Sequence, residues 1–270
     1  MAYSSDAPAQ RGFIPPRNEE ERLLMRRVEE LCQVAQRRGI PRYTGFLSDR
    51  EQTLAQAACH RAAFTEMRFW GGFENAERRV LCMEPAQAWQ EEPLGFLCLT
   101  ASAASGDKLP THRDYLGAIL GLGLDRACLG DLLQDPRDPG QYYAVVLADK
   151  LDFIAASLTG AGHCTVHTEI CAELPAHLQE GPERTLCEAT VSSLRADAVL
   201  AAMMHTSRSR AAEYMAAGRV EINHLPLRAP HETAYAGDIF TVRGVGRFRL
   251  MDIGGKSRKG RVFISFFQYG

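Results

Sequence analysis

The sequence predicts an α+β protein with an N-terminal helical segment, a central βαββαβ domain of ferredoxin-like topology and a small C-terminal α/β module. Apolar residues recur every three to four positions near the N-terminus, which is typical of amphipathic helices. The middle of the chain alternates strand and helix signals, and the last third combines two short helices with short strands. The 270 residues are enough for two or three domains.

Residues 1–18 contain no hydrophobic stretch of the kind that a secretory signal needs. They are expected to form a disordered N-terminal tail. A helical segment with a short hairpin then occupies residues 19–83. Its first helix is predicted over 18–38, with an apolar face. The second begins at a capping box, Ser48 with Glu51. Strands at 67–70 and 79–83 flank a turn at Gly71-Gly72.

The central domain is predicted over residues 84–172, and its elements follow the order of a split βαβ unit. RNA-recognition domains share this topology and stack bases on aromatic residues of their sheet. Here Tyr142 and Tyr143 are the aromatic residues of the third strand, without the usual basic-glycine-aromatic run, so the sequence does not favour base stacking on this sheet. The predicted elements are strand 94–101, helix 111–121, strands 129–134 and 142–147, helix 149–158 and strand 163–170.

The C-terminal domain is predicted over residues 183–270, after a loop at 173–182. A strand at 184–191 leads into two short helices between 193 and 218. Five further short strands are expected at 219–223, 226–228, 238–243, 247–253 and 261–267.

Charge is unevenly distributed along the chain. Residues 192–270 contain 12 Lys and Arg against 6 Asp and Glu, a net charge of +6. The first 191 residues contain 19 basic and 27 acidic residues, a net charge of −8. The positive charge of residues 192–270, next to the negative charge of residues 1–191, indicates that contact with nucleic acid is confined to the C-terminal domain.

The second short helix of this domain begins with charges that oppose its dipole. Thr206 or Ser207 can cap it, Gly218 can end it, and Arg208 and Arg210 fall in its first turn. Backbone N–H groups and two guanidiniums at a helix N-terminus can bind an anion such as phosphate. The alternative is a surface helix with two solvated arginines.

Two further basic runs follow. One surrounds the glycines of a predicted turn, and the other is a loop before the last strand. Glycine allows close approach of the backbone to phosphate, and Lys and Arg neutralise its charge. The runs comprise Arg243, Arg247 and Arg249, and Lys256, Arg258, Lys259 and Arg261.

Other chemistry is only weakly indicated. His163, Cys164, His167 and Cys171 alternate along a predicted strand, which is typical of a half-buried strand rather than a zinc site. The glycines between 121 and 123 follow a helix and lack the spacing of a nucleotide-binding loop. The carboxylates between 74 and 77 are interpreted as a capped turn with a local ion pair. No cofactor is expected, and eight scattered cysteines indicate reduced thiols in the cytoplasm.

Several motifs together resemble a known family. Arg195-Ala196-Asp197, Ser207-Arg208-Ser209, Gly218-Arg219-Val220 and Asn223 resemble the S-four type RNA-binding domain, with Ala196 in place of Leu and Ile222 in place of Val. The segments 71–78, 112–117, 130–131, 243–247 and 255–261 resemble the YlmH family of bacterial S-four proteins. The similarity covers nearly all of the chain after about residue 20.

The resemblance implies a ribosome-associated factor that binds the large subunit carrying an obstructing peptidyl-tRNA and acts in rescue or quality control of stalled translation. The expected partners are large-subunit rRNA and, as a second candidate, tRNA, without a membrane or a catalysed reaction. The expected RNA-binding residues are Arg195, Ser207, Arg208, Ser209, Arg210, Arg219, Asn223, His224, Arg243, Arg247, Lys256, Arg258 and Lys259.

Two alternatives remain open at this point. An RNA-modifying enzyme, either a pseudouridine synthase or a methyltransferase, could use the S-four module to bind its RNA substrate. An adaptor protein could recruit other proteins through the acidic N-terminal and central domains. Oligomeric state does not follow from these residues.

Overall fold

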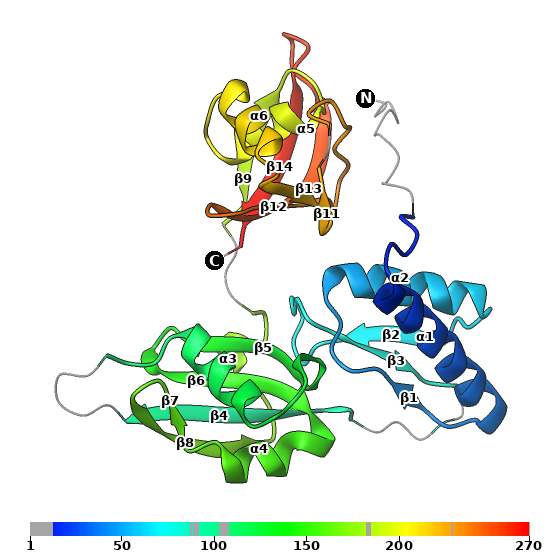
Figure 1. The fold of residues 1–270 in the computed structure, drawn as a ribbon, viewed down its shortest axis with the longest axis vertical. Helices are drawn as coiled ribbons and strands as arrows, with labels where there is room; N and C mark the ends of the chain where they lie inside the picture. The colour runs from blue at the N-terminus through cyan, green and yellow to red at the C-terminus, as the bar shows by residue number, and fades with distance from the viewer. Residues whose placement is uncertain are drawn as a thin grey trace. The chain divides into compact units, whose positions relative to one another are not determined.

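The computed structural model describes residues 13–86, 88, 92–102, 108–181, 185–227 and 229–269. The chain divides into two compact units, Pro15–Pro182 and Glu183–Gly270 (Figure 1). The boundary expected between residues 83 and 84 therefore falls inside the first unit. Among the described residues, no helix combines the length and the apolar character that crossing a membrane requires.

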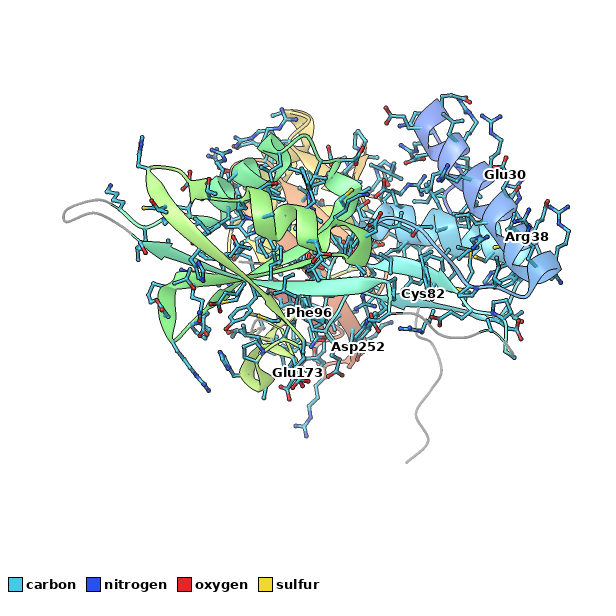
Figure 2. The ribbon with its side chains drawn as sticks, turned by 90° about the horizontal axis from the view of Figure 1, so that it is seen from below. Glu30, Arg38, Cys82, Phe96, Glu173 and Asp252 are labelled. Carbon is cyan, nitrogen blue, oxygen red and sulfur yellow. The ribbon has the colours of Figure 1, made fainter. Side chains whose placement is uncertain are left out.

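The first unit begins with two helices that cover a small sheet. Helices α1 (Glu19–Arg38) and α2 (Asp49–Arg61) lie on one side of strands β1 (Arg42–Tyr43), β2 (Met67–Trp70) and β3 (Val80–Met83) (Figure 1). The sheet order is β1-β3-β2, so β1 adds a third strand to the predicted hairpin. The capping box of Ser48 and Glu51 is confirmed. Glu30 and Arg38 lie on the exposed side of α1 (Figure 2).

Ordered contacts begin inside the segment that the sequence assigns to the tail. Residues 1–12 lie outside the described part of the chain. Asn18 caps α1 by accepting a hydrogen bond from the backbone N–H of Glu21. The carbonyl of Pro15 accepts one from the guanidinium of Arg50 at 3.0 Å, and Arg50 also pairs with Glu21. Residues 15–18 thus belong to the folded unit.

The central sheet has the strand order of a ferredoxin-like domain. Strands β4 (Leu94–Ser102), β5 (Leu129–Asp135), β6 (Asp138–Leu147), β7 (Gly160–Ala161) and β8 (Cys164–Cys171) are arranged β5-β6-β4-β8-β7, all antiparallel. Helices α3 (His112–Gly121) and α4 (Leu151–Ser157) complete the predicted βαββαβ order. The turn expected over 135–140 is shorter, because β6 already begins at Asp138.

Both faces of this sheet are covered. Helices α3 and α4 pack on one face, where Tyr115 and Ile154 contact Leu97, Leu99 and other residues of the sheet. The other face forms a separate cluster with residues that come before and after the domain in sequence, including Phe46, Phe73, Leu174 and Leu178. Cys82 and Phe96, both labelled in Figure 2, belong to this second layer.

A polar clamp joins the loop after β2 to the start of β5. The carboxylate of Asp131 accepts hydrogen bonds from the backbone N–H groups of Glu77 and Arg78, the shortest at 2.6 Å. The Arg78 guanidinium donates to the carbonyls of Leu129, Phe46 and Arg126. Burial raises the pKa of Asp131, although these hydrogen bonds lower it. Arg78, which follows the carboxylates expected to form a local ion pair, instead bridges two distant backbone segments, at Phe46 and at Arg126–Leu129.

Glycines at this junction permit close packing. A Cβ on Gly72, whose φ is +88°, would lie 2.8 Å from Val145 and 2.9 Å from Phe96. A Cβ on Gly130 would lie 2.6 Å from the ring of Phe46. These distances are too short for a side chain, so glycine is required at both positions.

The second unit is a single antiparallel sheet with two helices on one face. Its strand order is β11-β10-β12-β13-β14-β9. Strand β9, which precedes the helices, pairs with the last strand β14 and so belongs to the same sheet. The elements are β9 (Cys187–Val191), α5 (Ala196–Met203), α6 (Arg208–Ala216), β10 (Val220–Ile222), β11 (Leu225–Pro226), β12 (Ile239–Val242), β13 (Gly246–Lys256) and β14 (Val262–Gln268).

One core holds this unit together. The apolar sides of α5 and α6 meet inward-facing residues of β12, β13 and β14. The predicted alternation on the last strand is confirmed for Ile264 and Phe266, which are buried in this core, with Val262 packed against it. Buried members include Val199, Leu200, Met203, Ala211, Met215, Phe240, Phe248 and Leu250.

Replacing Asp131 by alanine should destabilise the first unit by on the order of 2 kcal/mol, because two half-buried N–H groups lose their acceptor. Both tryptophans of the sequence, Trp70 and Trp89, fall between residues 15 and 182, so denaturant unfolding followed by tryptophan fluorescence reports on this part of the chain. Asp152→Ala, at an exposed position of α4, serves as the matched control and should change stability by less than about 0.5 kcal/mol. Equal stability of the two variants would contradict the clamp.

Candidate nucleic-acid interface

Two predicted RNA-binding arginines meet at a buried carboxylate. Arg195 is the N-cap residue of α5, and Asp197 lies in the first turn of that helix. The Arg195 guanidinium contacts both oxygens of Asp197, Nε to Oδ1 at 3.2 Å and Nη2 to Oδ2 at 3.0 Å. Arg208, the first residue of α6, donates from Nη2 to the same Oδ2 at 2.8 Å. The two helix N-termini are thereby tied together.

The charges of this cluster are unequally exposed. The Asp197 side chain is 9% exposed, whereas those of Arg195 and Arg208 are 46% and 49% exposed. Burial alone would raise the pKa of Asp197, but hydrogen bonds from the two guanidiniums hold that pKa below its usual value. Asp197 is therefore ionised at neutral pH, and the groups that face solvent are the two cations.

The N-terminus of α6 is capped as the sequence predicts. The Ser207 hydroxyl accepts a hydrogen bond from the backbone N–H of Arg210 at 3.1 Å. Ser209 is exposed on the first turn. Arg208 and Arg210, expected to act together, point to different partners: Arg208 contacts Asp197, while Arg210 pairs with Glu213 at 2.7 Å.

A second basic cluster surrounds the ring of Tyr214. The guanidiniums of Arg210 and Arg219 lie 5.3 and 4.7 Å from the ring centroid, distances at which cation–π attraction operates. Arg219 also donates from Nη2 to the carbonyl of Arg243 at 2.6 Å. Arg243 is exposed at the turn between β12 and β13. This cluster joins the end of α6 to that turn.

Asn223 and His224 form the two-residue turn between β10 and β11. Both have positive φ, +50° and +62°, as this type of hairpin turn requires. The Asn223 side chain donates to Asp238 at 2.8 Å and accepts from the backbone N–H of Ile239 at 2.9 Å. The side-chain amide of Asn223 is thus used in hydrogen bonds within the protein, while the His224 side chain is exposed.

The remaining predicted residues are spread along β13. Phe248 and Leu250 face the helices, so Arg247 lies on the opposite face of the sheet, where it stacks 4.4 Å from the centroid of Tyr269. Lys256 ends β13, and Arg258 and Lys259 are exposed in the turn to β14. An 11-residue strand extends over about 33 Å, so this turn is far from Arg243 at the other end.

One end of the sheet nevertheless gathers several cations. Val191, the last residue of β9, pairs with Val262, the first residue of β14. The connection into α5 therefore leaves the sheet at the end where the turn with Arg258 and Lys259 lies. Arg261, which was not among the predicted site residues, holds this end together by donating to Thr190.

The central sheet offers no aromatic platform on its described strands. Tyr142 lies under the helices, where its ring packs 4.5 Å from that of Tyr115. Tyr143 points to the opposite face but is only 8% exposed, because Phe73, Leu174 and Leu178 lie in the same cluster. RNA-recognition domains use this second face for stacking, and here it is occupied by the protein itself.

The other chemistry considered above finds little geometric support. Among the described residues, no group of three or more His, Cys, Asp and Glu side chains is placed to hold a metal ion. Cys164 and Val166 are buried and His167 is exposed, as the alternation predicts, but Ile170 is 50% exposed rather than buried. Gly121 is the last residue of α3, and Gly123 follows the helix.

The structure therefore brings together some of the predicted residues and separates others. Arg195 and Arg208 meet at Asp197, and Arg210 and Arg219 both lie against the Tyr214 ring. Arg219 also contacts Arg243, whereas Arg247 lies on the other face of the sheet. The expected site residues left out two that organise these groups, namely Asp197, which was quoted as part of a motif but given no role, and Tyr214. The spacing of Tyr214 four residues after Arg210 on one helix was the available signal.

The chain is similar to a curated protein and to a solved structure. No family model matches the chain. It is 32% identical over 253 residues to a curated protein named ribosome-associated protein quality control protein P2 from Bacillus subtilis (strain 168), covering 92% of this chain and 95% of that protein. A solved structure described as cell division protein ylmH from Streptococcus pneumoniae is 18% identical, with a TM-score of 0.48 over 59% of this chain and 96% of that one.

The identity and coverage of the Bacillus subtilis relative are sufficient to assign the family. The segments that resemble YlmH proteins lie in both units of the fold, at the clamp of Asp131 in the first unit and around the two ends of β13 in the second. The chain belongs to the family of the ribosome-associated protein quality control protein P2 of Bacillus subtilis, the YlmH family that its motifs resemble.

Proposed function

We propose that the protein is a non-catalytic, RNA-binding factor of the bacterial cytoplasm that associates with the ribosome in quality control of stalled translation. Its second unit is an S-four type module that docks on large-subunit rRNA, and peptidyl-tRNA is a second candidate ligand. The name of the Bacillus subtilis relative supports the ribosomal setting. The observation that carries the RNA-binding role is the half-exposed pair Arg195 and Arg208 above a buried carboxylate.

The residues proposed to contact RNA are a revised set of those expected from the sequence. Arg195 and Arg208 bind phosphate, and Arg258, Lys259 and Lys256 extend the basic surface at the same end of the sheet. Arg210 and Arg219, which lie against Tyr214, form a second contact with Arg243, and Ser207 and Ser209 lie near Arg210 at the start of α6. His224 lies at the opposite end of β10, in an exposed turn where it offers a separate contact. Asn223 supports the fold, and Arg247 lies apart from these contacts.

Charge on the other unit favours this assignment. Residues 15–182 contain 17 Lys and Arg against 24 Asp and Glu, a net charge of −7, so this unit repels the phosphate backbone, while residues 183–270 contain 13 against 8, a net charge of +5. The face of the central sheet that could stack bases is covered. RNA contact is therefore assigned to the second unit.

The double variant Arg208→Ala with Arg210→Ala should bind large ribosomal subunits at least about tenfold more weakly, because charge-assisted contacts to phosphate are lost. Its affinity should also depend less on salt, with the slope of log K against log salt reduced by roughly 1 to 2. Co-sedimentation with purified 50S subunits at several salt concentrations measures both. The control is Arg22→Ala with Arg26→Ala on exposed positions of α1, which removes the same charge from the other unit. Equal loss in the two variants would contradict a local interface.

Asn223→Ala should act on stability rather than on RNA contact. It removes the hydrogen bonds to Asp238 and Ile239 and places alanine at positive φ, so on the order of 2 kcal/mol of local stability is lost. Hydrogen exchange measured by mass spectrometry should show faster exchange of residues 219–242. Asn223→Gly keeps the backbone conformation and should recover part of the protection. Normal exchange combined with lost 50S binding would show instead that Asn223 contacts RNA.

The rival function, rRNA modification, predicts a different chemical outcome. If the protein only binds RNA, then rRNA from a deletion strain has the same set of modified nucleotides as rRNA from the parent strain. Mass spectrometry of the digested rRNA makes this comparison. A modification that disappears on deletion and returns on complementation would establish an enzyme and overturn the non-catalytic proposal.

A further inference from the structure

We propose that Asp197 is a positioning residue, which holds the guanidiniums of Arg195 and Arg208 side by side so that a single RNA phosphate can bridge them. This inference rests on the proposed RNA-binding function and adds the way in which the site is assembled. Asp197 itself touches no RNA. Its role is to bring together two cations that would otherwise separate.

The geometry of the shared oxygen carries this inference. Nη2 of Arg195 and Nη2 of Arg208 both donate to Oδ2 of Asp197, at 3.0 and 2.8 Å. The two guanidiniums therefore lie next to each other, although like charges repel at this range. They come from the starts of two different helices, so neither helix alone fixes their spacing.

The free donors of the pair are on the solvent side. Arg195 uses Nε and Nη2 for Asp197, and Arg208 uses Nη2. Within the described part of the chain, Nη1 of Arg195 and both Nε and Nη1 of Arg208 have no hydrogen-bond partner. Since both side chains are about half exposed, these donors are available to a ligand.

Phosphate is the ligand that fits such donors. A guanidinium presents paired N–H groups at fixed geometry, and a phosphate offers several acceptor oxygens that two guanidiniums can share. Its negative charge also offsets the repulsion between the two cations, which the single carboxylate only partly relieves. A phosphodiester of the RNA backbone supplies this group regularly along the chain.

A positioning role and a purely electrostatic role of Asp197 predict opposite changes in the affinity for RNA when Asp197 is replaced by Asn. If Asp197 only contributes a negative charge near the RNA, then Asp197→Asn should strengthen binding, because phosphate is repelled less. If Asp197 positions the arginines, then Asp197→Asn should weaken binding despite the more positive charge of the module. The sign of the change therefore separates the two roles.

The experiment measures binding of the full-length protein to purified bacterial 50S subunits by co-sedimentation. Asp197→Asn is expected to weaken binding by about fivefold or more, a size typical of lost charge-assisted contacts. Glu213→Gln removes the same charge from an exposed carboxylate that pairs with Arg210, and it should bind unchanged or more tightly. Unchanged or tighter binding by a folded Asp197→Asn protein overturns the proposal.

A second measurement leaves Asp197 in place and covers the case in which Asp197→Asn does not fold. Arg195→Gln and Arg208→Gln are compared with the double variant. A shared phosphate predicts coupling, so the double variant should lose about as much affinity as the more severe single variant. Additive losses overturn the shared site. If the double variant binds normally, the proposed RNA-binding function itself fails, which distinguishes the two failures.

Discussion

The buried carboxylate of Asp197 is the interaction on which the proposed RNA-binding surface depends. It accepts from arginines at the starts of α5 and α6 and so fixes these two short helices relative to each other. A helix of eight or nine residues has little stability of its own and relies on such tertiary contacts. The same carboxylate offsets the charge of arginines placed where the helix dipoles disfavour them. One group thus stabilises the helix pair and keeps its cations at the surface.

In the first unit, the charged residues of the family motifs hold the fold together. Asp131 and Arg78 contact backbone groups of other segments rather than solvent, and Gly72 and Gly130 allow those segments to approach. The N-terminal helices and the ferredoxin-like sheet therefore form one compact unit. Because this packing covers the sheet face that RNA-recognition domains use, the resemblance in topology does not extend to the same binding mode.

The sequence predicts the architecture well where the local signals are strong. The capping box of Ser48, the cap of Ser207 and the order of strands and helices in the central domain are all confirmed, because periodicity and caps are local properties. The two-residue strands β1 and β7 were missed, since so few residues carry no pattern. The grouping of the basic residues was predicted less well. Which face of β13 carries Arg247, and which partner Arg208 selects, depend on long-range packing that spacing in the sequence does not encode.

The central claim is that RNA is bound by the helix pair of the second unit. Crosslinking of the protein to RNA in cells, with the crosslinked peptides and nucleotides both mapped, tests this most directly. The expected result is crosslinks from residues 193–219 and from the turn at 257–261 to large-subunit rRNA, with few from residues 15–182. Crosslinks concentrated in residues 15–182, or a helix pair that is never crosslinked while the protein co-purifies with ribosomes, would contradict the claim.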